Sequence, residues 1–291
     1  MSLLATAAEP WTDRRRRTAE LRRRQPFAGE LLDLYGALLP VQEQAYVEAS
    51  AAPPAPDDLA VYAAELVVPG VHEVSLAAGP DRLRRALVRR LEQEHPVNIL
   101  GAWIRGEEQS VVDRYIARAS LTPVFEALGP EAGAACAGSR DPRHCPHCGG
   151  SPQLSYFAVA GEDLATGPRY LLCARCHSSW GCARMTCAGC GEDSSVRLPI
   201  LSEEGTTSGE RGSIVRGLPA GPANGRSAVE TVLFPHIRVE ACETCRQYLL
   251  SIDLASDPSA VPLVDELAAI PLDLVARERG FSKILPNLMG F

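Results

Sequence analysis

The sequence predicts an α+β protein with a helical N-terminal half, two small lobes built from cysteine pairs, and a C-terminal helix. The first 135 residues contain no cysteine and repeat their apolar residues at helical spacing. Eight of the ten cysteines follow in four Cys-x-x-Cys pairs, and another apolar segment of helical spacing comes after them. We expect a helical domain at 1–138, a first lobe at 139–186, a second lobe at 187–255 and a C-terminal helical segment at 256–291.

Segments of the first half have apolar residues three and four positions apart, which is typical of amphipathic helices. They lie around Leu38, after Asp58, from Asp81 and from Val111, and the last is expected to stop near Pro123. We therefore expect four to six helices in this half. The arginines at 14–17 and 22–24 are expected on the solvated face of a leading helix or in a mobile terminus.

Short apolar runs between the cysteine pairs predict β-strands. The expected strands are 154–159, 169–172, 196–201, 229–239 and 248–254. Residues 203–224 are rich in Gly, Ser and Thr and poor in apolar residues, which predicts a mobile loop. The apolar segment beyond Pro262 predicts a helix that Pro271 kinks or divides.

The four cysteine pairs predict two metal sites. Two cysteines three residues apart can bind one ion from a single tight turn, and two such turns complete a tetrahedral tetrathiolate site. In a reducing compartment such thiolates bind metal in preference to forming disulfides. Because neighbours in sequence usually lie close in space, site 1 is expected to contain Cys145, Cys148, Cys173 and Cys176, and site 2 Cys187, Cys190, Cys242 and Cys245. An interleaved pairing of the same cysteines is the alternative.

The residues around the cysteines fit this interpretation. Gly149 follows the second cysteine of its pair and can adopt the positive φ that lets the chain turn away, and Gly191 occupies the same place in the second set. The 24 residues between the first two pairs accommodate a hairpin, the layout of a zinc ribbon or a rubredoxin. Since four sulfurs complete each site, the neighbouring histidines are expected outside the coordination shell: His144, His147 and His177. Cys136 is expected in a linker and Cys182 packed within the first lobe.

Composition and local context bear on the function class. The sequence contains no recognisable nucleophile–base–acid arrangement and no phosphate-binding loop, so we do not expect an enzyme. A net charge of −7 argues against nucleic acid as a default partner, and no apolar run reaches the length of a membrane span. The N-terminal arginines are not followed by the apolar stretch of an export signal, so we expect a cytoplasmic protein.

Two other functions are compatible with cysteine pairs. A thiol-redox protein needs only one Cys-x-x-Cys, placed at a helix N-terminus where the thiol pKa is lowered. A zinc-ribbon nucleic-acid-binding protein needs clustered cations and exposed aromatic residues on the ribbons. The four pairs in two matched sets favour metal ligation over redox cycling. Acidic and basic residues are roughly balanced between Cys145 and Cys245, and Trp180 and Tyr170 are expected in the core or at its rim, which argues against a nucleic-acid-binding protein.

The cysteine motifs also resemble a known family. Their order is Cys-Pro-x-Cys-Gly-Gly-x-Pro at 145–152, Arg-Tyr-Leu-x-Cys-x-x-Cys-x-x-x-Trp at 169–180, Arg-x-x-Cys-x-x-Cys-Gly at 184–191 and Glu-x-Cys-x-x-Cys-x-x-Tyr at 240–248. This order, together with the segment at 265–291, is similar to the formate dehydrogenase accessory protein family, FdhE.

The resemblance implies a cytoplasmic maturation factor that is not an enzyme. Such proteins bind the catalytic subunit of respiratory formate dehydrogenases that are exported by the twin-arginine route. The resemblance also implies rubredoxin-like iron in the two sites and the eight paired cysteines as its ligands. Zinc is the alternative, because tetrahedral sulfur sites suit both metals.

Overall fold

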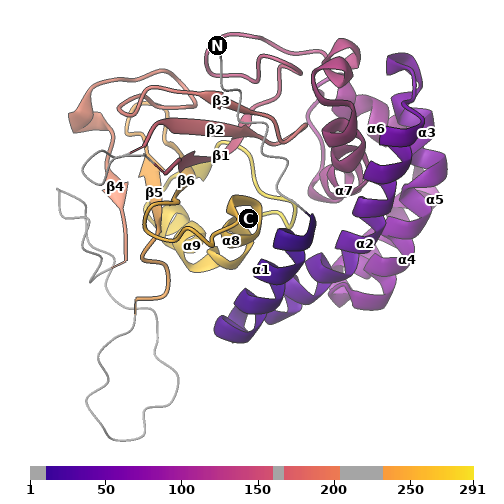
Figure 1. Cartoon of the computed structure of the whole chain (residues 1–291), viewed down its shortest axis with the longest axis horizontal. Helices are drawn as coiled ribbons and strands as arrows, with labels where there is room; N and C mark the ends of the chain where they lie inside the picture. Colours follow the sequence, from indigo (N-terminus) through magenta and orange to yellow (C-terminus); the bar gives the residue numbers. More distant parts are fainter. Residues whose placement is uncertain (1–10, 160–166, 204–231) are drawn as a thin grey trace, which may run out of the picture.

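The computed structural model describes residues 11–159, 167–203 and 232–291. Nearly all of the loop expected at 203–224 therefore lies outside the described residues, as do the N-terminal residues 1–10. Helices occupy the first half of the chain and stand beside one mixed sheet, and the C-terminal helices cover a face of that sheet (Figure 1). The predicted α+β class is confirmed.

Seven α-helices lie in the described part of the first half, more than the four to six expected. They are α1 (Trp11–Arg24), α2 (Gly29–Ala51), α3 (Leu59–Leu66), α4 (Val68–Ala78), α5 (Asp81–Gln93), α6 (Pro96–Ile104) and α7 (Val111–Leu128). Short 3₁₀ helices precede α2 and α3 and follow α7: η1 (Pro26–Ala28), η2 (Pro56–Asp58) and η3 (Gly129–Ala135). The helix starts expected after Asp58, at Asp81 and at Val111 are confirmed.

The expectation that the last of these helices stops near Pro123 is wrong, because α7 continues to Leu128. Proline has no N–H, so the carbonyl of Ala119, four residues earlier, loses its usual helical partner. The side-chain amide Nε2 of Gln42, on α2, donates to that carbonyl oxygen at 3.1 Å. A neighbouring helix thus satisfies the group that the proline leaves open.

The second half forms a seven-stranded sheet in the described residues. Its strands are β1 (Pro152–Phe157), β2 (Arg169–Cys173), β3 (Ser179–Gly181), β4 (Ile200–Leu201), β5 (Ile237–Ala241), β6 (Gln247–Asp253) and β7 (Ser282–Lys283). The order is β3-β2-β1-β6-β5-β4. The short strand β7 pairs with the N-terminal end of β6, at Gln247 and Tyr248. Strands β1 and β6 run parallel, with Leu154 opposite Leu250, so the hairpins of the two predicted lobes join in one sheet.

Two expected strands are shorter than predicted. The segment 196–201 is a strand only at β4, and its first residues form the 3₁₀ helix η4 (Ser195–Arg197). Val196 is 89% exposed, so no core contact holds it in a strand, and Pro199 lacks the N–H that a ladder needs. The strand expected at 229–239 begins at Ile237, after a turn at Pro235 and His236, and residues 229–231 lie outside the described residues.

The C-terminal segment contains two helices, α8 (Pro262–Ala268) and α9 (Ile270–Glu278). Pro271 lies in the first turn of α9, where backbone N–H groups have no partner within the helix, so the missing N–H loses no hydrogen bond. The helical conformation is interrupted just before it, at Ala269. The expected division at this proline is confirmed. Both helices lie against one face of the sheet (Figure 1), and Val264 and Leu267 of α8 share one buried cluster with Leu272 of α9 and Leu250 of β6.

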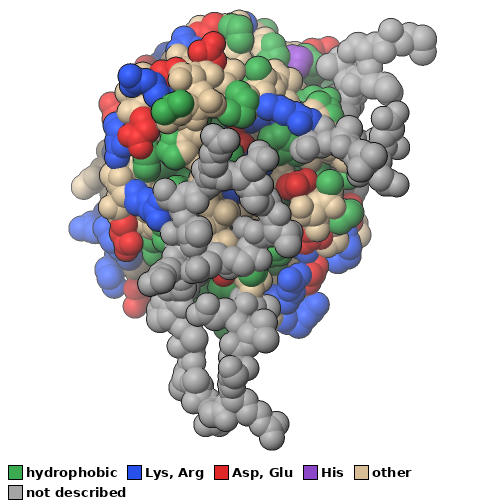
Figure 2. Space-filling model, turned by 90° about the vertical axis from the view of Figure 1, so that its left-hand side faces the viewer, with side chains coloured by type: hydrophobic (Ala, Val, Ile, Leu, Met, Phe, Trp, Pro, Cys, Tyr) green, Lys and Arg blue, Asp and Glu red, His purple; other side chains and the backbone are tan. Residues whose placement is uncertain are grey.

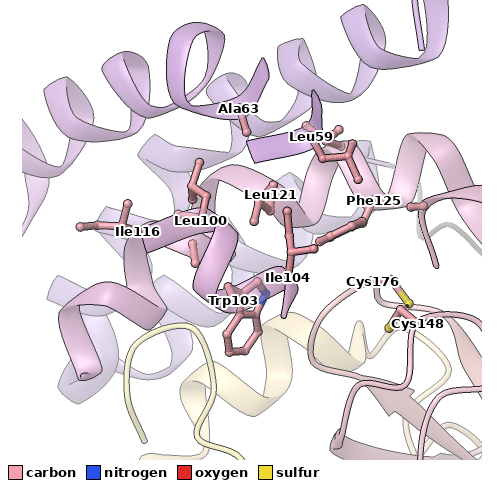
Figure 3. Packing of buried hydrophobic residues seen from close by; sticks show 14 of the residues in the cluster. Leu59, Ala63, Leu100, Trp103, Ile104, Ile116, Leu121, Phe125, Cys148 and Cys176 are labelled. Atoms are coloured by element: carbon pink, nitrogen blue, oxygen red, sulfur yellow. Dashed lines mark hydrogen bonds between the residues drawn. The ribbon is translucent and has the colours of Figure 1, made fainter. Parts of the chain in front are cut away.

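A second buried cluster fills the helical half and extends into the first cysteine pairs. It contains Trp103, Leu121 and Phe125 together with Cys148 and Cys176 (Figure 3). The sulfurs of the first lobe are therefore part of the same core as helices α6 and α7. The helical half and the first lobe share buried surface.

The expectation that the N-terminal arginines are solvated is wrong for two of them. Arg17 is 1% exposed and Arg14 is 3% exposed, whereas the other arginines at 15, 16 and 22–24 are exposed. Arg17 donates all five of its N–H groups: Nε and Nη2 to Asp265, Nη2 also to Asp257, and Nη1 to Ser259 and Glu20. Burial by itself lowers the pKa of Arg17, but the two aspartates outweigh it and raise that pKa above its usual range.

Replacing Arg17 by Leu is expected to lower the free energy of unfolding by about 3–5 kcal/mol, because it leaves the buried carboxylate of Asp265 and the half-buried carboxylate of Asp257 without their cation. Urea unfolding of the full chain measures the change. The matched control is Arg16→Leu, an exposed arginine of the same helix, for which a change within about 0.5 kcal/mol is expected. Equal losses in the two variants would contradict the role given to Arg17.

Candidate metal centres

Each of the four Cys-x-x-Cys pairs occupies a turn with the same backbone hydrogen bonds. In the first, the N–H of Cys145 donates to the carbonyl of Gly150 at 2.9 Å, and the N–H of Gly149 donates back to the carbonyl of Cys145 at 2.9 Å. The turns that begin at Cys173, Cys187 and Cys242 repeat both bonds, at distances of 2.8–3.2 Å. The chain therefore builds one local structure four times.

The residue after each second cysteine has a positive φ. The values are +67° at Gly149, +54° at His177, +84° at Gly191 and +58° at Arg246. The positive φ is predicted from the sequence at the two glycines but not at His177 and Arg246, because neither histidine nor arginine is a turn residue by type. Their identical place in the repeated motif is the signal that could have found them. At this place the backbone must take the left-handed conformation whichever residue occupies it.

The four turns come together in two groups of four sulfurs. Site 1 brings together Cys145, Cys148, Cys173 and Cys176, and site 2 Cys187, Cys190, Cys242 and Cys245. Each group consists of pairs that are neighbours in sequence, and the structure does not interleave them. Within each group the ligand atoms lie within 4.8 Å of one another.

The sulfur positions fit a tetrahedral metal ion. Sγ–Sγ distances are 3.4 Å for Cys148–Cys173 and 3.6 Å for Cys145–Cys176 in site 1, and 3.7 Å for Cys187–Cys245 in site 2. Four sulfurs about 2.3 Å from one ion, at tetrahedral angles, lie about 3.8 Å apart. The two cysteine tetrads could therefore bind two metal ions.

The sheet positions both tetrads. In site 1, one turn directly precedes β1 and the other follows β2, so the β1–β2 hairpin brings its own two ends together. In site 2, the turn between β5 and β6 faces the turn that begins at Cys187, before β4. Thr244 Oγ1 donates to Glu192 Oε2 at 2.6 Å and links the two turns.

Site 1 is enclosed by the helical half. All four of its cysteines are buried, and Arg175, between Cys173 and Cys176, is buried with them. Arg175 Nη1 donates to the carbonyls of Cys148 at 2.8 Å and Ala137 at 2.9 Å, which joins the two turns to the segment after η3. Its guanidinium also lies 5.8 Å from the ring of Trp103 on α6.

The histidines near the cysteines have partners other than the sulfurs. His177 Nδ1 contacts the carboxylate of Glu126, which also accepts from Arg14 Nη2 at 2.9 Å. Burial by itself raises the pKa of Glu126, but Arg14 and His177 outweigh it and lower that pKa to about 2. His144 Nδ1 lies 2.8 Å from Asp141 Oδ1. The contact of His177 with Glu126, and that of Glu126 with Arg14, connect site 1 to α7 and α1.

The two cysteines outside the tetrads have separate environments. Cys136 is buried at the end of η3, its Sγ donates to the carbonyl of Ala132 at 3.6 Å, and burial raises its pKa to about 11. Cys182 is half-buried after β3 and accepts from Arg169 Nη1 at 3.3 Å. Neither lies in a group of ligand atoms.

A third group of potential metal ligands is paired with an arginine. His236, Asp257 and Asp265 lie close together, but the carboxylates of the two aspartates accept hydrogen bonds from Arg17, the buried arginine of α1. His236 Nε2 lies 2.8 Å from Asp265 Oδ1. This group is an ion-pair network whose cation is the guanidinium.

The fold and the cysteines define a class of protein: a helical domain joined to a sheet that carries two cysteine tetrads suited to metal. Residues 227–289 match the family model described as "FdhE, C-terminal domain". A "Protein FdhE homolog" of Aquifex aeolicus is 32% identical over 150 residues, 51% of this chain and 42% of that protein. Another, of Pseudomonas aeruginosa, is 32% identical over 145 residues, 50% of this chain and 38% of that protein.

A solved structure has the same fold. The crystal structure of the FdhE protein from Pseudomonas aeruginosa matches with a TM-score of 0.58 and 22% identity, over 96% of this chain and 94% of that one. The alignments to the curated relatives span less than half of those proteins' length. Together the matches confirm the resemblance indicated by the cysteine motifs: the chain is similar to the FdhE proteins.

No single helix in the described residues is both long and apolar enough to cross a bilayer. One pair bent by 41°, 56–66 with 68–78, meets the length and composition criteria together.

The two turn glycines are expected to differ when replaced by alanine. A Cβ on Gly191 would lie 3.9 Å from its nearest neighbour, Arg143 Cδ, so it would meet no clash. Gly191→Ala should therefore lower the free energy of unfolding by only about 1–2 kcal/mol, the cost of placing alanine in the left-handed conformation. A Cβ on Gly149 would lie 2.8 Å from the backbone carbonyl carbon of Gly138, so Gly149→Ala should lower the free energy of unfolding more than Gly191→Ala does. Urea unfolding of both variants tests this, and a smaller loss for Gly149→Ala would contradict it.

Proposed function

We propose that this protein is a maturation factor for a formate dehydrogenase and is not itself an enzyme. In this proposal it acts in the cytoplasm and binds the catalytic subunit of a respiratory formate dehydrogenase before twin-arginine export. The similarity to FdhE proteins supports the maturation role. The single observation that carries the proposal is the pair of cysteine tetrads, held on a fold that an FdhE crystal structure shares.

We also propose that the eight tetrad cysteines hold two metal ions. The ligands are Cys145, Cys148, Cys173 and Cys176 in site 1, and Cys187, Cys190, Cys242 and Cys245 in site 2. Sulfur-only tetrahedral sites suit both iron and zinc, and the family resemblance favours iron. Four protein ligands fill a tetrahedral ion, which leaves no position for the water or substrate that a catalytic zinc needs.

The geometry disfavours thiol-redox catalysis. Such a site usually places its first cysteine at a helix N-terminus, which lowers the thiol pKa. Here all four pairs lie in turns that precede or follow strands. The sulfurs of each tetrad approach one another to 3.4–3.7 Å. This spacing suits four thiolates that coordinate one shared metal ion.

The metal content of anaerobically purified protein is expected to be two ions per chain. Cys145→Ser and Cys187→Ser should each reduce the content to one ion, because each removes a ligand from a different tetrad. Cys182→Ser, which changes a half-buried cysteine outside both tetrads, is the control and should keep two ions. Elemental analysis measures the content, and an absorption spectrum distinguishes coloured iron–thiolate sites from colourless zinc. Two ions retained in Cys145→Ser would contradict the ligand set.

The protein loaded with metal is expected to retain a formate dehydrogenase catalytic subunit in an anaerobic pull-down of purified components. It should not shift a fluorescent nucleic-acid probe, whose binding to a zinc ribbon would weaken steeply with salt. On the side of the molecule shown in Figure 2, positive and negative side chains are interspersed, as on an ordinary solvated surface. Failure to retain the subunit, together with a salt-dependent probe shift, would favour the nucleic-acid-binding alternative.

A further inference from the structure

The two tetrads have the same ligands and turns, yet their surroundings differ. We propose that site 2 is the exchangeable metal site, at which an ion is acquired from or passed to an external thiol, whereas site 1 is a closed structural site. This inference rests on the proposed binding of metal by both tetrads. It assigns exchange to Cys190 and Cys245 in particular.

The first argument is access. The four cysteines of site 1 are at most 3% exposed, whereas Cys190 and Cys245 of site 2 are half-buried. An incoming ligand must reach the ion before an original ligand has left. At site 2, half-buried Cys190 and Cys245 lie on the side from which such a ligand would approach.

Backbone segments also cover site 1. A Cβ on Gly150 would lie 2.8 Å from the sulfur of Cys173 and 3.2 Å from that of Cys148, so the chain passes directly over these two sulfurs. A Cβ on Gly133, in η3, would lie 2.1 Å from the carbonyl oxygen of His147. The segment after α7 is thus pressed against the first turn and covers it.

The second argument is charge. A divalent ion with four thiolates carries a formal charge of −2, which is costly to bury without compensating cations. Two buried guanidiniums meet this need near site 1. Arg175 bonds the carbonyl of Cys148, and Arg118 on α7 lies close enough for the charge of Cys173 to affect it.

Neither guanidinium forms an ion pair with a carboxylate in the part of the chain that the structure describes. Arg118 donates to the carbonyl of Pro286 at 2.6 Å and to the side-chain oxygen of Gln153, and both arginines leave Nε without a partner. Burial lowers the pKa of Arg118 to about 10, and the charge of Glu266 opposes this shift only in part. A negatively charged tetrathiolate complex would supply further negative charge beside both arginines.

Site 2 has a different electrostatic environment. The cation nearest its first turn, Arg143, donates weakly to the carbonyl of Gly189 at 3.5 Å and is paired with Asp141 at 2.9 Å. Glu243, within the second turn, pairs with exposed Arg246 at 2.8 Å. The charge of an ion here is compensated by water, which reaches half-buried Cys190 and Cys245, so the complex can exchange ligands without an unpaired buried charge.

The exchange step needs no electron transfer. The sulfur of an incoming thiol forms a bond to the ion and releases its proton. The bond between the ion and Cys245 breaks, and the departing Cys245 thiolate takes up a proton. The number of thiolates on the ion is unchanged, and repetition with the other ligands transfers the ion to the acceptor.

Release of metal to an excess of the chromogenic chelator 4-(2-pyridylazo)resorcinol tests the inference on the loaded full-length protein. We expect two phases of equal amplitude whose rate constants differ by at least tenfold. Cys245→Ser should retain one ion and lose the fast phase. A single phase from protein with two ions, or a fast phase that persists in Cys245→Ser, would overturn the inference while leaving the proposed metal sites intact. Protein that binds no metal would overturn both.

Two arginine variants test the role of charge separately from that of access. Arg175→Gln should accelerate the slow phase at least tenfold, because it removes a buried cation from site 1, while the fast phase stays unchanged. Arg143→Gln, beside site 2, is the matched control and should leave the slow phase unchanged. Equal effects of the two variants on the slow phase would contradict the assignment of Arg175. Circular dichroism verifies that both variants are folded.

Alkylation of the metal-loaded protein by iodoacetamide, mapped by mass spectrometry, gives a measurement independent of any variant. Cys190 and Cys245 should be modified before Cys145 and Cys148, because the thiolate must reach the reagent carbon to displace iodide. Earlier modification of the site 1 cysteines would contradict the closed character of that site.

Discussion

The structure depends on the placement of four cysteine sulfurs inside the core that the helical half shares with the sheet. Leu121 and Phe125 of α7 and Trp103 of α6 belong to the same buried cluster as Cys148 and Cys176 (Figure 3). A bound metal ion would organise four thiols this close together. Metal bound at site 1 would therefore be coupled to the packing of α6 and α7 against the first hairpin.

Two further interactions hold together parts of the chain that are distant in sequence. The parallel pairing of β1 and β6 joins the hairpins of the two tetrads, and a parallel pair needs a long connection, which here includes the first turn of site 2. Arg17 connects α1 to Asp265 on α8, with all five of its N–H groups donated. Arg17 and Asp265 are both buried, so loss of Arg17 leaves the Asp265 carboxylate buried without its cation.

The two tetrads show how position in a fold can give different chemistry to identical ligands. Their turns have the same hydrogen bonds and the same positive φ after the second cysteine. One tetrad lies between the hairpin and the helices with Arg118 and Arg175 beside it, and the other lies at the exposed end of the sheet. Solvent access and buried charge control ligand exchange, and both are set by the neighbouring elements.

The sequence by itself determined the class of the fold, the helix starts at Asp81 and Val111, and the grouping of cysteines into pairs. These features are local, because helical periodicity and Cys-x-x-Cys turns depend on residues within a few positions of one another. Only the tertiary structure decided that α7 continues through Pro123, since the donor that makes this possible is Gln42 on another helix. It also decided that Arg14 and Arg17 are buried, because their carboxylate partners, Glu126 and Asp265, lie more than 100 residues away. Joining the two lobes in one sheet and enclosing site 1 depend likewise on contacts between distant segments, which no short sequence pattern records.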